Sequence, residues 1–153
     1  MIRQCSRWPC WFALLLLTAS GCGKALVFND SVDGTVKLDG KPLGSAYIQF
    51  VPDEPGIKAP GSSGFTDENG HYRLTREGGE SGALVGHHRV VLVRGREANR
   101  ALGEKPDATE TAKAKKDRRP IPTVYMMASQ TPLKIEVTAD KHTYDLDLSS
   151  SAR

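Results

Sequence analysis

The chain has 153 residues, of which 25% are charged and 39% hydrophobic, with a net charge of +3 and three cysteines. This length fits one domain with tails and excludes a large two-domain enzyme with its own cofactor lobe. The apolar and aromatic content suffices for a folded core, which argues against disorder along the whole chain.

The first 22 residues have the pattern of an export signal. Arg3 and Arg7 precede a short apolar run at 11–17, which is too short to span a membrane but fits a signal-peptide core. Small residues then precede Cys22 and resemble the bacterial lipobox, in which the cysteine is acylated and becomes residue one. We therefore expect a lipoprotein signal peptide at 1–21 and lipidation of Cys22. Cleavage of an ordinary secretory signal is the alternative.

Cysteine usage agrees with a lipoprotein. Cys5 and Cys10 fall in the removed segment, so Cys22 is the single cysteine of the mature chain and has no disulfide partner. Two or three acyl chains anchor a protein firmly. The expected location is the cell envelope, on the periplasmic or outer surface of a membrane. The mature chain has 19 Lys+Arg against 18 Asp+Glu, and this balance and the exported location argue against nucleic-acid binding.

After an expected lipidated tether at 22–31, the hydrophobic period becomes two. Alternation at 34–38 stops at an Asp-Gly-Lys-Pro turn and resumes at 45–51, which predicts two strands. Proline and glycine mark 52–63 as a loop. Two further short segments flank Asn69-Gly70, which is the strongest short signal for a hairpin.

The second half continues the short-strand pattern after a glycine-rich loop at 76–86. Residues 87–94 are apolar on both faces at their centre, which predicts a strand covered on both sides. Alternation at 133–137 and 144–148, joined by a short link, predicts a terminal hairpin. Six or seven short strands without a long helix predict an all-β sandwich over 32–150.

A 24-residue stretch at 96–119 departs from this pattern. It has eight Lys+Arg, five Asp+Glu and no aromatic residue. Loops of this length are uncommon in compact domains. We expect a solvated basic insertion; contact of its lysines and arginines with anionic lipid headgroups is the alternative.

Several turn and strand motifs together resemble the carboxypeptidase regulatory-like domain. They are Gly34-Thr35-Val36-Lys37-Leu38-Asp39-Gly40-Lys41-Pro42-Leu43, Gly64-Phe65-Thr66-Asp67-Glu68-Asn69-Gly70-His71-Tyr72-Arg73-Leu74 and Gly86-His87-His88-Arg89-Val90-Val91-Leu92-Val93. The resemblance covers about 32–95, and the segment from Ile121 to Val137 resembles the closing strands of small bacterial lipoproteins with this module. It implies a seven-stranded transthyretin-like (prealbumin-like, Ig-like) sandwich and an accessory, non-catalytic role.

Side chains that could carry chemistry favour a structural interpretation, and we predict no catalytic, cofactor or metal site. The four histidines (His71, His87, His88 and His142) lack zinc-site spacing, and His87 and His88 must point to opposite faces of one strand. Asp67-Glu68-Asn69-Gly70 lacks the distant glutamate of a calcium loop and is better explained by a turn.

The remaining polar motifs lead to the same expectation. Asp145 and Asp147 share the outer face of the last strand, where a cross-strand salt bridge with Lys134 is a plainer role than hydrolysis. No serine lies in a nucleophile elbow, and the glycine-rich loop lacks a phosphate-binding motif.

Two functional hypotheses follow. The first is a lipoprotein whose sandwich is an interaction or structural module that docks an envelope protein through loops 52–63, 76–86 or 96–119, with Tyr47 as a partly exposed aromatic. The alternative is a carbohydrate-binding accessory module for an envelope polysaccharide. The mature chain has no tryptophan, which leaves Tyr125 and Tyr144 as the aromatics for sugar contacts.

Overall fold

The computed structural model describes residues 26–56, 59–94 and 120–152. The predicted signal peptide, Cys22 and the basic insertion at 96–119 lie outside the described residues. Within the described part the chain is all-β, as predicted, with eleven strand segments and one short 3-10 helix, η1 (Thr123–Met126).

The larger sheet has five antiparallel strands in the order β10-β9-β4-β5-β7. These are β4 (Ala46–Pro52), β5 (Ser62–Phe65), β7 (Thr75–Arg76), β9 (Gly86–Arg94) and β10 (Lys134–Val137). The second sheet is built on β2, which pairs with β11 in parallel and with β3 and β6 in antiparallel orientation. Its strands are β2 (Asp33–Leu38), β3 (Lys41–Pro42), β6 (His71–Arg73) and β11 (Leu146–Leu148).

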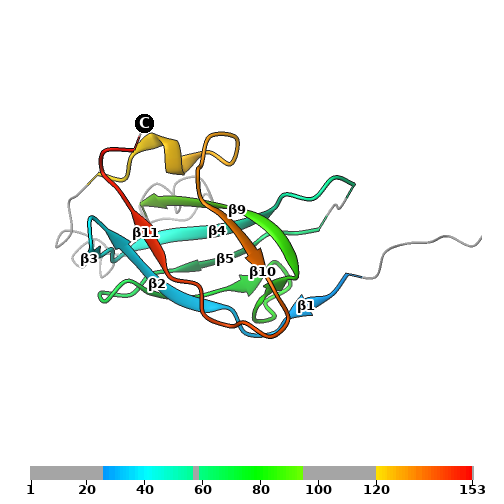
Figure 1. Ribbon diagram of the computed structural model, residues 1–153. Coiled ribbons are helices and arrows are strands. Elements are labelled where there is room, and N and C mark those ends of the chain that lie inside the picture. Colours follow the sequence, from blue (N-terminus) through cyan, green and yellow to red (C-terminus); the bar gives the residue numbers. More distant parts are fainter. Residues whose placement is uncertain (1–25, 57–58, 95–119, 153) are drawn as a thin grey trace, which may run out of the picture.

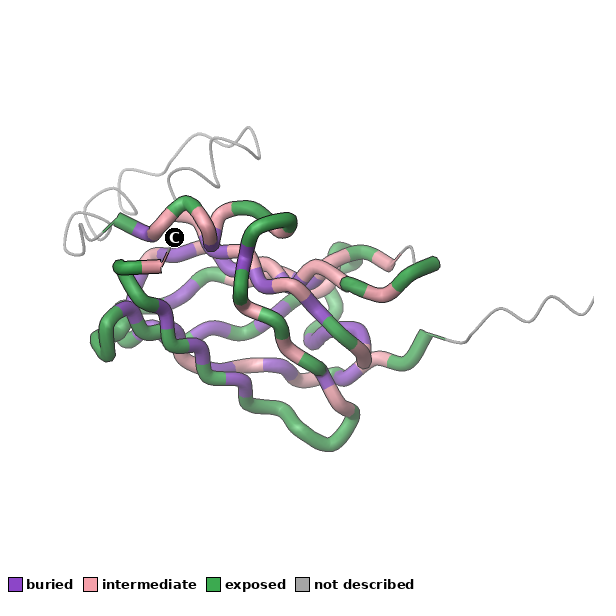
Figure 2. The backbone as a smooth tube through the Cα atoms, turned by 45° about the horizontal axis from the view of Figure 1, so that its top comes forward, coloured by how far each residue is buried: buried purple, intermediate pink, exposed green. Residues whose placement is uncertain are grey.

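The two sheets pack against each other in a sandwich-like arrangement (Figure 1). In the longer strands alternate residues are buried, so that β2 and β4 both show the period of two that their sequences predict (Figure 2). The core includes side chains from both sheets, among them Val36, Leu38, Ile48, Phe50, Tyr72, Val90, Leu92, Leu146 and Leu148.

The sequence-based pairing of the strands needs two corrections. The turn at Asn69-Gly70 forms, with Gly70 at φ +76, but β5 pairs with β4 and β7 whereas β6 pairs with β2. The chain therefore passes from one sheet to the other instead of forming a simple hairpin. The predicted terminal hairpin is also wrong, because β10 pairs with β9 and β11 pairs with β2.

The position of Tyr144 explains the second correction. Its ring is buried in the core, and its hydroxyl accepts a hydrogen bond from Thr138 N at 3.0 Å and donates one to Lys141 O at 3.0 Å. Its backbone N donates to Asp33 O at 2.8 Å, which aligns this segment with β2. The link at 138–143 is thus fixed as a crossing between sheets.

The end of the expected tether belongs to the folded domain. Phe28–Asn29 form β1, which pairs with β8 (Ala83–Leu84). β1 lies at one end of the domain and the β2–β3 turn at the other (Figure 1); we call the first the tether end. The structured part therefore begins before residue 32, because β1 finds hydrogen-bond partners in β8.

Candidate functional site

The outer faces of the two sheets differ in chemical character. On the second sheet, the outward residues of β2, β6 and β11 are polar or charged: Asp33, Thr35, Lys37, His71, Arg73 and Asp147. On the five-stranded sheet, outward positions of β4, β5 and β9 carry the apolar or aromatic side chains Tyr47, Val51, Phe65, Val91 and Val93. A solvated outer face normally alternates to polar residues, so only the larger sheet departs from that pattern.

Strand register aligns three of these side chains across the sheet. Tyr47 of β4 is paired with Phe65 of β5 on one side and with Val93 of β9 on the other. The rings of Tyr47 and Phe65 lie 5.2 Å apart between centroids at an interplanar angle of 57°, and Phe65 is 45% exposed. We call Phe65, Tyr47 and Val93 the aromatic row. It lies toward the end of the sheet opposite the tether end.

The outer face becomes polar toward the tether end. Gln49 lies next to the aromatic row on β4, and beyond it Val51 is paired with Arg89. Arg89 Nε forms an ion pair with Asp53 at 2.8 Å, and the guanidinium lowers the pKa of the Asp53 carboxyl. Arg89 is also paired with Lys134 of β10. An apolar row bordered by charged groups is the composition of a protein-binding surface.

Strand β9 corrects the prediction of a strand covered on both sides. Val90 and Leu92 are fully buried in the core, whereas Val91 and Val93 are only partly buried. The described residues thus bury one face of this strand and leave the other accessible. β9 is therefore apolar on both faces but covered on only one. This places the strand at the centre of the candidate surface.

The adjacent histidines point to opposite faces, as predicted. His87 is exposed, while His88 is buried, packs 5.9 Å from the Phe50 ring and has Nδ1 3.0 Å from Gly86 O. Burial lowers the pKa of His88 because desolvation disfavours the imidazolium. This side chain serves the core and not a ligand site.

The buried histidine predicts a loss of stability in mild acid. Because His88 has a lowered pKa in the folded state, only the unfolded state takes up this proton just below pH 6.5. As the pH is lowered below 6.5, the free energy of unfolding should therefore decrease, by at most about 1.4 kcal/mol per pH unit for this group. Urea denaturation between pH 7.5 and 5 should show this slope flattened in His88→Phe and retained in His87→Gln. An unchanged slope in His88→Phe would contradict this assignment.

The acidic candidates are engaged in local structure. The Asp67 carboxylate accepts hydrogen bonds from Asn69 N and His71 N, both at 2.8 Å, as the turn interpretation predicts. Asp145 accepts from the backbone N and hydroxyl of Thr35, and these bonds lower its pKa. The salt bridge to Lys134 expected from a terminal hairpin lacks its basis, because β10 and β11 are not paired.

The aromatics expected to serve a carbohydrate site are not available. Tyr125 and Tyr144 are both core residues, each 4% exposed. The Tyr125 hydroxyl is occupied by Ser149, whose backbone N donates to it at 3.1 Å. The exposed aromatic that sequence reasoning missed is Phe65. Strand alternation could place Tyr47 outward, but only the β4–β5 register brings Phe65 beside it.

Neither a metal site nor a membrane-spanning helix emerges from the part of the chain that the structure describes. Within 26–56, 59–94 and 120–152, no three His, Cys, Asp or Glu side chains are grouped to hold a metal ion. In the same ranges, no helix is both long and apolar enough to cross a membrane. Comparison of the chain with protein-family models, with curated proteins and with solved structures gives no match.

Proposed function

We propose that this chain is a lipoprotein of the cell envelope, acylated on Cys22, whose non-catalytic domain binds a protein partner through the aromatic row. The domain is a seven-stranded transthyretin-like sandwich of the carboxypeptidase regulatory-like type. The observation that carries the binding function is β9, a strand with two apolar faces of which the described residues bury one. An apolar partner surface supplies the second cover.

The strand arrangement supports the proposed fold. Among the described elements, β1, β3 and β8 have two residues each, and β6 and β7 are separated only by Leu74. Counting β6 and β7 as one bent strand leaves seven principal strands, in two sheets around one core. The Asp39-Gly40 turn, with both residues at positive φ, closes the β2–β3 hairpin that the family-like motif contains.

The chemistry of the aromatic row supports a protein partner over a polysaccharide. Sugar-binding platforms use aromatic faces that lie along one saccharide surface, whereas the Tyr47 and Phe65 rings are inclined by 57°. Aromatic and aliphatic side chains in the centre with an ion pair at the border match the anatomy of protein interfaces. Aromatic residues also dominate the energetic centres of such interfaces.

A photo-crosslinking experiment tests the proposed binding surface. A benzophenone amino acid at residue 65 of the lipidated protein should capture one defined envelope protein, whereas the same probe at residue 37, on the outer face of the other sheet, should not. Phe65→Ser and Tyr47→Ser should each weaken the purified complex about 10- to 30-fold, as expected when an interface aromatic is lost. Lys37→Ser is the matched control for an exposed strand position.

The same experiment has outcomes that reject the protein-binding proposal. Equal capture from residues 65 and 37, or unchanged affinity in both aromatic variants, would contradict binding through the aromatic row. Retention on cell-wall polysaccharide that Phe65→Ser abolishes would favour the carbohydrate-binding alternative.

Loss of membrane association in Cys22→Ser, with partner binding retained, is the result expected if the lipid only localises the domain.

A further inference from the structure

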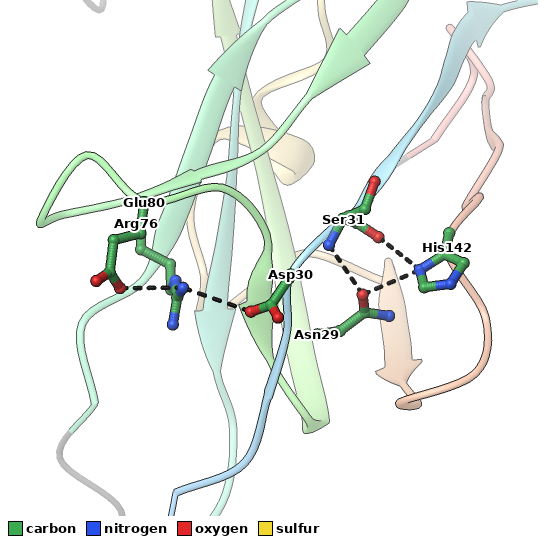
Figure 3. A network of polar contacts seen from close by, with 6 residues as sticks. All are labelled: Asn29, Asp30, Ser31, Arg76, Glu80 and His142. Atoms are coloured by element: carbon green, nitrogen blue, oxygen red, sulfur yellow. Dashed lines mark hydrogen bonds and ion pairs between the residues drawn. The ribbon is translucent and has the colours of Figure 1, made fainter.

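The first strand is fixed to the domain by the side chain of Asn29. This residue is 2% exposed, and its Nδ2 donates to Thr138 O at 2.8 Å and to Lys141 O at 2.7 Å. Its Oδ1 accepts from Ser31 N at 3.0 Å and lies 3.1 Å from His142 Nδ1 (Figure 3). The two donor and two acceptor positions of the amide are therefore all used, and three of their four partners lie in the crossing at 138–143, which joins β1 to it.

Arg76 fixes the other side of β1. Its guanidinium lies 4.4 Å above the centroid of the Phe28 ring, and it forms ion pairs with Asp30 at 3.7 Å and Glu80 at 3.0 Å (Figure 3). Stacking of arginine on an aromatic ring is a favourable contact. β1 is thus a fixed part of the domain and not a loose extension.

Two apolar side chains are held outward just before this fixed strand. Val85 N donates to Val27 O at 2.8 Å, so the backbone at residue 27 is still attached to the domain. Nevertheless, Val27 is 55% exposed and Leu26 is 43% exposed. Leu26 follows Cys22 by four residues, which corresponds to at most about 14 Å of extended chain.

We propose that Leu26 and Val27 contact the lipid–water interface of the membrane that holds the lipidated Cys22. This inference rests on the lipid anchor of the proposed function. The short chain brings the apolar pair within reach of the headgroup layer, where exposed apolar side chains partition favourably. Arg76 at this end is already paired with the carboxylates of Asp30 and Glu80, so the proposed contact is apolar and does not depend on attraction to anionic lipid.

This contact orients the whole domain. The tether end faces the membrane. The aromatic row lies toward the opposite end of β4, where Tyr47 is about 17 Å along the strand from Pro52. The binding surface is then presented away from the bilayer, to a partner that reaches it from the aqueous side. The lipid anchor alone would not impose this orientation.

Single tryptophans provide a direct test, since the mature chain contains none of its own. Leu26→Trp and Val27→Trp variants, purified from membranes and reconstituted into phosphatidylcholine vesicles, should show blue-shifted emission and quenching by brominated lipid. Phe65→Trp is the matched control at an exposed apolar position and should show neither. Replacing half of the lipid by phosphatidylglycerol should not increase quenching at 26 or 27.

Mass spectrometry of the same samples separates the two possible failures. A lipidated protein whose residues 26 and 27 show no shift and no quenching would overturn the interface contact while leaving the anchor intact. A protein without lipid would remove the anchor, and with it the contact proposed here. Equal quenching at residues 26 and 65 would overturn the proposed orientation.

Discussion

Replacing Gly34 by alanine should destabilise the domain by about 3 kcal/mol, because β2 has no room for a side chain at this position. A Cβ there would lie 2.6 Å from the carbonyl carbon of Tyr144 and 3.1 Å from Cε1 of Tyr72. Both neighbours are fixed, since the Tyr72 hydroxyl donates to Tyr144 O at 2.6 Å in the core. The added methyl group would separate β2 from the segment that leads into β11. Urea denaturation measures the loss.

Gly78→Ala is the matched control for this substitution. Gly78 lies in the turn after β7, its Cβ position has no atom within 4 Å, and its φ is not in the left-handed region. The free energy of unfolding should therefore change by no more than about 0.5 kcal/mol. A loss at Gly34 as small as the loss at Gly78 would show that the Tyr144 backbone can move away without cost.

The sequence predicts the individual strands better than their partners. The period of two at β2 and β4 depends on neighbouring residues alone, so the burial of Val36, Leu38, Ile48 and Phe50 could be predicted from local pattern. Pairing depends on contacts far apart in the chain. The short link before Tyr144 reads as a hairpin turn, but the hydrogen bonds of the Tyr144 hydroxyl make it a crossing between sheets.

The candidate site follows the same division between local and distant information. The apolar residues on both faces of β9 are visible in the sequence, where they predict a strand covered on both sides; that only one face is buried depends on how the two sheets pack. The contact between Tyr47 and Phe65 requires the β4–β5 register, which the intervening loop does not reveal. The absence of tryptophan from the expected mature chain leaves Tyr125 and Tyr144 as the aromatics for sugar contacts, but their burial depends on the tertiary fold and not on the local pattern.

The clearest example of distant information is Asn29, which the sequence places in a tether. The neighbouring residues do not predict that its amide will bind carbonyls more than 100 positions away. A polar side chain with two donors and one acceptor fits this position because two carbonyls and an N–H converge there. This complementarity makes the residue sensitive to a change that preserves its shape.

Asn29→Asp should release β1 from the domain, although the two side chains have nearly the same size. The substitution replaces the donor Nδ2 by an oxygen that faces Thr138 O and Lys141 O at hydrogen-bond distance. A buried charge without compensation costs about 3–5 kcal/mol. The state in which β1 is separated from the crossing at 138–143 should therefore have the lower free energy. Hydrogen exchange should show this as lost protection of the Val85 amide, which binds Val27 O.

Asp30→Asn removes only an exposed contact and should leave that protection within about 0.5 kcal/mol of the parent protein. Full protection in Asn29→Asp would mean that the pairing with β8 and the Arg76 contacts hold β1 without the amide, and Leu26 and Val27 would then keep their place.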